Sequence, residues 1–224
     1  MFSHIARTED DSYTRIAILG AIILLATTPV PAPAASYVIP AGDTLVNSDT
    51  LIYNRGDSLN ILGTLSSSGT VSNSGIIQGT GTISNSGSIY NGFWGMLGIV
   101  TLDNGIGGTV DNYGNIQWGT ADNYGTMNNY KDLYNPTGGE LNNYSFLNNA
   151  SYFENWGTLN NKSGGTLNNA GYLQSTGTLN NDGTFNIQDH GQLFSSGTLN
   201  NNGEINNAGK LEIYGGSQNN FGTL

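Results

Sequence analysis

The chain has 224 residues, no cysteine and a formal charge of −10 at pH 7, and only 10% of its side chains are charged. This acidic balance excludes a nucleic-acid-binding protein, which carries clustered basic residues, and the lack of cysteine excludes a disulfide scaffold. The hydrophobic residues, 37% of the chain, are regularly spaced, which favours a narrow folded core over disorder.

The N-terminal segment has the features of a secretory signal peptide. The stretch IAILGAIILLATT, residues 16–28, is an apolar run without a charge, and APA at residues 32–34 has the small-x-small form of a cleavage site. Residues 1–34 are therefore predicted to be removed on export, which places residues 35–224 outside the cell or on its surface. Acidic residues at positions 9 to 11 are atypical of a signal peptide, so an uncleaved segment in the membrane is the alternative.

A six-residue repeat follows this segment. In GTLSSSGTVSNSGIIQGTGTISNSGSI the apolar centres recur in every hexad, at Leu65, Val71, Ile77, Ile83 and Ile89. A helix would need apolar residues three and four apart, and the recurring glycines disfavour it. A short strand closed by an Asn/Gly corner fits, because both residues tolerate positive φ. Stacked strands of this kind predict an all-β fold, a single parallel β-solenoid over residues 35–224, with right-handed winding favoured.

A 26-residue superperiod, called the long repeat below, runs through the C-terminal half and consists of four hexads and an inserted dipeptide. Aligning its copies gives four apolar columns: Leu141, Leu167, Leu193; Leu147, Leu173, Leu199; Phe153, Leu179, Ile205; Leu159, Phe185, Leu211. This spacing favours one coil with four facets or two flattened coils, and fits a three-sided coil of three hexads less well. Asparagines two residues after the apolar centres predict amide ladders along the solenoid axis.

Aromatic residues mark candidate binding positions. Residues 92–108, GFWGMLGIVTLDNGIGG, break the hexad rhythm and are expected to form an irregular coil or loop that carries Phe93 and Trp94. The long repeat would stack Trp118 on Tyr144 and Tyr130 on Trp156 along one edge. Such an edge could bind sugar rings or another filament, or simply shield the corners.

No catalytic, metal or cofactor site stands out. After the signal segment no two acidic residues lie one long repeat apart, as carboxylates aligned on adjacent coils of that length would, and His190 is the only histidine there. Cysteine ligands and nucleotide-binding fingerprints are absent from the sequence. Threonine arrays that would bind ice are not expected either, because one outward column reads Glu140, Thr166, Gln192.

The segments GGTLNNAG, GTLNNDG and GTLNNNGEINNAG resemble the Asn/Gly-rich repeats of secreted β-solenoid surface proteins. The repeats are similar in style to those of autotransporter passenger domains and filamentous-haemagglutinin-type adhesins, and the resemblance covers about Ile39 to Leu224. It implies surface exposure and a role in adhesion or in a matrix. The final NNFGTL stops inside a hexad, which suggests head-to-tail self-association or a longer protein.

The sequence thus predicts an exported, non-enzymatic structural or adhesive β-solenoid without a cofactor. Its expected partners are other copies of the chain and surface glycans, not nucleic acid, with membrane contact only through an uncleaved signal segment. The alternative is a carbohydrate-binding or polysaccharide-cleaving β-helix protein.

Overall fold

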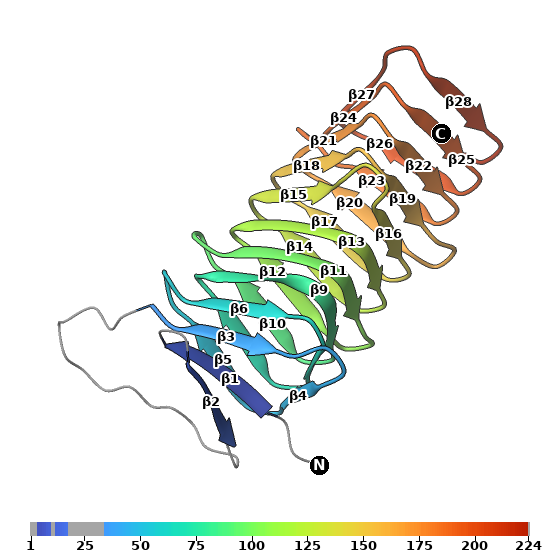
Figure 1. The fold of residues 1–224 in the computed structure, drawn as a ribbon. Coiled ribbons are helices and arrows are strands. Elements are labelled where there is room, and N and C mark those ends of the chain that lie inside the picture. Colours follow the sequence, from blue (N-terminus) through green and yellow to red (C-terminus); the bar gives the residue numbers. More distant parts are fainter. Residues whose placement is uncertain (1–3, 10–11, 18–33, 224) are drawn as a thin grey trace.

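A computed structural model describes residues 4–9, 12–17 and 34–223 of the chain. Residues 34–223 form a parallel β-solenoid, and no helix occurs in the part of the chain that the structure describes (Figure 1). The predicted fold class is therefore confirmed. Each coil has three faces, and the strands of each face pair in parallel with their counterparts one coil away.

The three faces are numbered in chain order within a coil. The first face consists of β3 (Ser36–Ile39), β6 (Ser58–Ile61), β15 (Asp132–Asn135), β18 (Tyr152–Asn155), β21 (Tyr172–Ser175), β24 (Gln192–Ser195) and β27 (Lys210–Ile213). The second face consists of β4 (Thr44–Asn47), β7 (Thr64–Ser67), β16 (Glu140–Asn143), β19 (Thr158–Asn161), β22 (Thr178–Asn181), β25 (Thr198–Asn201) and β28 (Ser217–Asn220). Three longer strands, β9 (Ile76–Asn85), β11 (Met96–Asn104) and β13 (Asn115–Asn123), cross from the first face to the second.

The third face is a separate sheet of nine strands. It consists of β5 (Thr50–Tyr53), β8 (Thr70–Asn73), β10 (Ser88–Asn91), β12 (Thr109–Asn112), β14 (Thr126–Asn129), β17 (Phe146–Asn149), β20 (Thr166–Asn169), β23 (Thr184–Ile187) and β26 (Glu204–Asn207).

Strand β22 shows how the recurring TLNN segment folds. Leu179 and Asn181 point into the solenoid and are buried, whereas Thr178 and Asn180 face outward and are half-buried. This alternation follows from the two-residue side-chain period of a strand. The buried leucines and their counterparts on other coils form one continuous core along the axis. Each coil therefore contributes little apolar surface, and stability comes from the contacts between coils.

The length of a coil differs from the one predicted. Leu141 pairs with Leu159, and Leu159 pairs with Leu179. Leu141 does not pair with Leu167, so the four columns built on the long repeat are wrong, as are the four-facet and flattened coils. Three hexads make one three-sided coil of 18 residues, as from Asn143 to Asn161, and an inserted dipeptide extends the coil to 20 residues, as from Asn161 to Asn181.

The long repeat arises because the inserted dipeptide moves around the coil. The enlarged corners at residues 136–139, 162–165 and 188–191 lie after the first, second and third face respectively. Each enlarged corner therefore lies one full coil plus one face further along the chain than the enlarged corner before it. The third residue of these corners has a positive φ, at Gly138, Gly164 and His190. The dipeptide therefore changes the corner and leaves the stacking of the strands intact.

Amide ladders are present, as predicted, but their members differ. On the second face Asn143, Asn161, Asn181 and Asn201 are buried, and each donates to the next with N–O distances of 2.7–2.8 Å. Asn155 lies two residues after Phe153, so the alignment on the long repeat placed it in one column with Asn181, but it bonds instead to the hydroxyl of Ser175. These ladders satisfy polar groups that the coil buries.

Residues 92–108 are more regular than expected. A four-residue corner over residues 92–95 leads into β11, whose nine residues run without a corner across two faces. The irregular feature of this segment is a shift in the register of β11 against β9, between Ile99 and Thr101. The hexad rhythm is lost here because Leu97 and Leu102 of β11 are five residues apart, whereas their partners Ile77 and Ile83 in β9 are six apart.

The N-terminal residues contribute a short hairpin. Strands β1 (His4–Glu9) and β2 (Ser12–Ala17) are antiparallel, and β1 pairs with β3. Of the predicted signal segment, residues 18–33 lie outside the described residues. Within the described residues, no helix is long and apolar enough to cross a membrane.

Candidate binding site

The most prominent aromatic cluster lies at the corner between the third and first faces. Residues 92–95 form a tight turn between β10 and β11, closed by a 2.7 Å bond from the N–H of Gly95 to the carbonyl of Gly92. Because the turn points its two central side chains away from the core, Phe93 and Trp94 are 59% and 60% exposed. Their rings meet edge to face, with centroids 4.9 Å apart.

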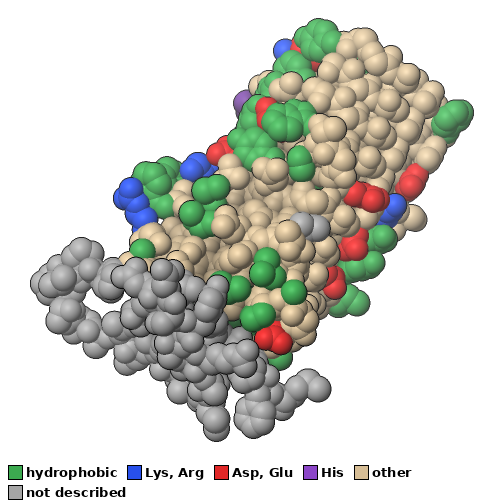
Figure 2. Space-filling model, viewed as in Figure 1, with side chains coloured by type: hydrophobic (Ala, Val, Ile, Leu, Met, Phe, Trp, Pro, Cys, Tyr) green, Lys and Arg blue, Asp and Glu red, His purple; other side chains and the backbone are tan. Residues whose placement is uncertain are grey.

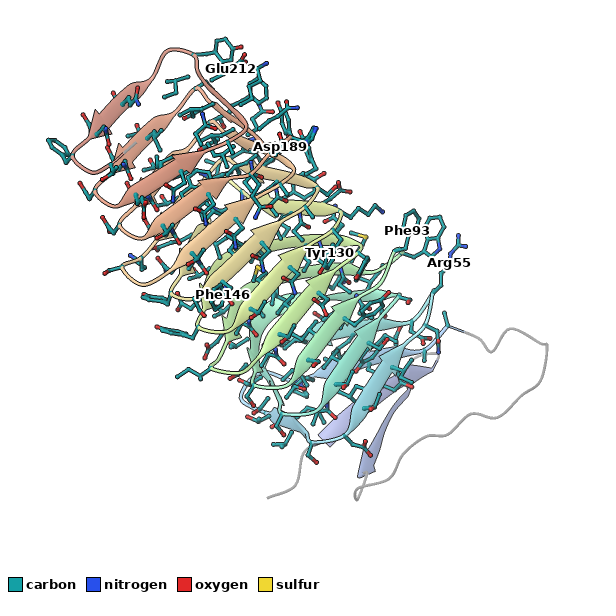
Figure 3. The ribbon with its side chains drawn as sticks, turned by 180° about the vertical axis from the view of Figure 1, so that it is seen from behind. Arg55, Phe93, Tyr130, Phe146, Asp189 and Glu212 are labelled. Carbon is teal, nitrogen blue, oxygen red and sulfur yellow. The ribbon has the colours of Figure 1, made fainter. Side chains whose placement is uncertain are left out.

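Two basic side chains from other coils each lie over one face of these rings. Arg55 follows β5, two coils before, and its Cζ lies 4.7 Å from the centroid of a Trp94 ring. Lys131 follows β14, two coils beyond, with Nζ 4.1 Å from the Phe93 centroid and 3.2 Å from the Phe93 carbonyl oxygen to which it donates. Figure 3 shows Arg55 and Phe93 projecting from the same edge. We call Arg55, Phe93, Trp94 and Lys131 the corner site.

The corner site has an unusual charge for this chain. The sequence contains six Lys and Arg against 16 Asp and Glu, and two of the six lie here. Among the described residues the ion pairs are His190–Asp189 and Lys210–Glu212, so neither Arg55 nor Lys131 takes part. The nearby Asp57 carboxylate instead accepts the backbone N–H groups of Asn54 and Ala35. The corner site is therefore a local basic and aromatic patch on an acidic surface.

Tyrosines beside the corner site, and others at the corner between the second and third faces, are stacked on one another. The rings of Tyr113 and Tyr130 are 4.5 Å apart at 15°, and those of Tyr124 and Tyr144 are 4.4 Å apart at 5°. The faces of such rings are turned toward their neighbours along the axis, and their edges face the solvent. A sugar docks on a ring face, so these stacks shield the corners better than they bind sugars.

The structure does not place the predicted aromatic residues on one edge. Tyr130 lies at the same corner as Phe93 and Trp94, Tyr144 lies between the second and third faces, and Trp156 lies between the first and second. Their supposed stacking partners are also wrong, because Tyr130 stacks on Tyr113 and Tyr144 on Tyr124.

The prediction that Trp118 belongs to a surface binding edge is also wrong. This residue is 1% exposed and belongs to the core. It follows Gln117 in β13 and takes the inward position that asparagine occupies in later coils of the first face. An aromatic residue at this point in the sequence therefore fills the interior and cannot contact a ligand at the surface.

Sequence reasoning missed a row of aromatic side chains that runs along the first face and ends at the corner after β27. Its members are Tyr134, Tyr152, Tyr172, Phe194 and Tyr214, with successive ring centroids 5.0–6.5 Å apart. Tyr152 donates a hydrogen bond to Glu154, which raises the pKa of this tyrosine. At the far end of the row a hydrogen bond from Lys210 lowers the pKa of Glu212. These residues align in the sequence only when it is divided into coils of three hexads, some of which contain the inserted dipeptide.

The correct coil length also changes the search for paired carboxylates. Asp103 and Asp122 occupy directly paired positions on β11 and β13, which the spacing of the long repeat did not reveal. Asp122 accepts a 2.9 Å hydrogen bond from the Asn142 amide. In the described residues, no group of three or more His, Cys, Asp or Glu side chains is arranged to hold a metal ion.

No match to this chain was found among models of protein families, curated proteins or solved structures. The likeness to autotransporter passengers and filamentous-haemagglutinin-type adhesins therefore rests on the style of the repeats alone.

Proposed function

We propose that the chain is an exported structural or adhesive β-solenoid of the cell surface or extracellular matrix and that it performs no catalysis. The observation that carries this proposal is the continuous stacking from β13 to β28, where successive strands of the second face pair four residues at a time without a register shift. Backbone and amide hydrogen bonds along the axis make such a stack a stiff rod. Export is supported by the apolar run and the APA tripeptide that follows it.

The adhesive part of the proposal concerns the corner site. Exposed rings bind the apolar faces of sugars, and cations beside them attract carboxylates on the same ligand. The partner class that fits this combination is a surface glycan with acidic sugars. The surrounding negative charge would repel such a ligand elsewhere on the rod, so binding is confined to this corner.

The test compares Trp94→Ala with Trp156→Ala in binding to an immobilised uronic-acid polysaccharide. Both remove an exposed tryptophan, but Trp156 lies at another corner, and within the described residues no Lys or Arg lies over its ring. We expect Trp94→Ala to weaken binding about tenfold and Trp156→Ala to leave it unchanged. Equal binding by both variants and the unchanged chain would overturn the glycan proposal.

Export is tested separately. The full-length chain is expressed in a secreting bacterial host, and the N-terminus of the product outside the cytoplasm is determined by mass spectrometry. A mature chain beginning at Ala35 supports the proposal, and retention of the whole chain in the cytoplasm contradicts it.

A second candidate function is polysaccharide cleavage, which the pairing of Asp103 with Asp122 favours. Strands one coil apart are about 4.8 Å from each other, which brings these carboxyl groups within the range that acid and nucleophile need. The expected result for this function is release of reducing ends from a polysaccharide, lost in Asp122→Asn and retained in Asp189→Asn, whose side chain is exposed at an enlarged corner.

A further inference from the structure

The second face presents a column of outward hydroxyl side chains. In order along the axis, the paired residues are Thr44, Thr64, Thr82, Thr101, Thr120, Glu140, Thr158, Thr178, Thr198 and Ser217. Only Glu140 lacks a hydroxyl group. The expectation that no threonine array forms was wrong, because the alignment on the long repeat combined residues of three different faces.

A column of amides runs beside the hydroxyl column. Asn160, Asn180, Asn200 and Asn219 are joined by hydrogen bonds of 2.7–2.8 Å from each Nδ2 to the Oδ1 of the preceding residue. These bonds fix the amide side chains, and the branched side chain of threonine has few accessible rotamers. The face is therefore ordered before it meets a ligand, so little conformational entropy is lost on binding.

The two columns form a regular grid. Strands one coil apart are about 4.8 Å from each other, and outward residues two apart on one strand are about 6.6 Å from each other. Unshifted pairing from β19 through β22 and β25 to β28 repeats this grid over four coils. The hydroxyls and amides consequently lie in a lattice that is periodic in two directions.

This grid carries no charge although the chain is strongly acidic. The outward-pointing positions of β19, β22, β25 and β28 hold Thr or Ser followed by Asn; Asn160 of β19 is buried, and the others are half-buried or exposed. Figure 2 shows this part of the surface as an almost uninterrupted area without hydrophobic or charged side chains, and the acidic groups lie along its border. The complementary partner is an uncharged surface of hydrogen-bonding groups at similar spacing.

We propose that the second face from β19 to β28 binds the surface of ice. An ice face is an uncharged lattice of water molecules whose repeat distances are close to those of this grid. Each threonine hydroxyl both donates and accepts hydrogen bonds, so it can replace a lattice water, whereas a charged side chain orders water around itself in a different arrangement. This activity goes beyond the proposed function and requires neither export nor glycan binding.

The other two faces lack this combination. The first face carries the aromatic row and the ion pair at its far end. On the third face, Phe146 and Glu204 limit the threonines between them to two coils. In the earlier coils of that face, Tyr90 and Asp111 occupy the outward position beside the hydroxyl column. The second face is therefore the one that offers an extended neutral grid.

The experiment measures the gap between the melting and freezing points of ice in solutions of the full chain, and its inhibition of ice recrystallisation. Thr178→Lys places a charge at the centre of the grid. Gln192→Lys is the matched control, because Gln192 faces outward at the same position of β24 on the first face. Circular dichroism and the melting temperature verify that each variant is folded. Thr198→Lys, one coil further, serves as the second variant should Thr178→Lys fail to fold.

The full chain is expected to produce a measurable gap, reduced several-fold by Thr178→Lys and retained by Gln192→Lys. A folded full chain without a gap or recrystallisation inhibition would overturn the proposal, as would equal losses in both variants. Retention on crystalline chitin or cellulose that is lost in Thr178→Lys, without any effect on ice, would overturn it in favour of a neutral polysaccharide. Glycan binding at the corner site is measured by the Trp94→Ala test and is independent of these outcomes.

Discussion

The side-chain amide of Asn161 donates a 2.7 Å hydrogen bond to Oδ1 of Asn181, which lies one coil further along the solenoid. Asn161 also accepts a bond from Asn143 and donates one to the backbone carbonyl of Thr184. The three asparagine side chains are buried, so water cannot replace a missing partner. The hydrogen-bonding groups of one coil are thus satisfied only when the next coil is in place.

We expect Asn161→Ala to lower the free energy of unfolding by about 3 kcal/mol, because it leaves several buried groups without partners. Asn206→Ala, which removes an exposed amide bonded to Asn186, is expected to cost less than about 0.5 kcal/mol. Urea titrations followed by circular dichroism measure both. Similar losses in the two variants would contradict a special role for the buried ladder.

Two glycine substitutions separate close packing from backbone strain. A Cβ on Gly197 would lie 1.9 Å from the carbonyl oxygen of Gly177 on the preceding coil, so Gly197→Ala is expected to cost about 4 kcal/mol or prevent folding. A Cβ on Gly164 would meet nothing within 4 Å, but φ is +84°, and Gly164→Ala should cost about 1 kcal/mol. Thermal unfolding of both variants tests this order, and the reverse order would refute it.

The burial of Trp118 is measurable by fluorescence. The chain has three tryptophans, so the double variant Trp94→Phe, Trp156→Phe reports on Trp118 alone. Because Trp118 is buried, its emission should be blue-shifted and protected from iodide. The matched variant Trp118→Phe, Trp156→Phe leaves the exposed Trp94, whose emission should be red-shifted and readily quenched. Similar quenching of both variants would place Trp118 at the surface.

Alkaline pH should destabilise the fold through Tyr53. Burial raises the pKa of this tyrosine above its usual value, with smaller contributions from Tyr37 and Asp57. The folded state therefore holds the phenolic proton more tightly than the unfolded state. Its contribution is complete below about pH 10, the pKa of an unfolded tyrosine, and is lost as the pH rises toward the folded pKa.

Tyr53→Phe removes this titration. Between pH 8 and pH 11 the unchanged chain should lose about 1 kcal/mol more stability than Tyr53→Phe does. Urea midpoints at the two pH values give the comparison. Parallel losses in the two proteins would show that Tyr53 does not titrate differently on unfolding.

The local conformation could be predicted from the sequence, because it depends on residues within one hexad. The apolar residue at the centre of TLNN and the glycine after it predict a short strand and a corner, and the structure confirms both at Leu179. Coil length could not be predicted in this way. It depends on which hexad lies above which, and Leu159 and Leu167 are equally suitable partners for Leu141 by residue type.

The candidate site was predicted only in part for the same reason. Phe93 and Trp94 could be identified because they interrupt the repeat locally. Their neighbours Arg55 and Lys131 come from two coils before and two coils beyond, so finding them requires the coil length. Trp118 was misplaced because its inward direction depends on its position along β13, which the alignment on the long repeat did not give.

The direction of the hydrogen bonds has a mechanical consequence. In this solenoid the backbone bonds between strands lie along the axis, so a force that pulls the two ends of the rod apart acts on one coil interface at a time. Each coil that opens would release 18 to 20 residues, the separations within the Asn143, Asn161 and Asn181 ladder, or roughly 60 to 70 Å of extended chain. Stretching single molecules should give force peaks at that interval. A rod of this kind would lengthen stepwise under load and keep its remaining coils folded.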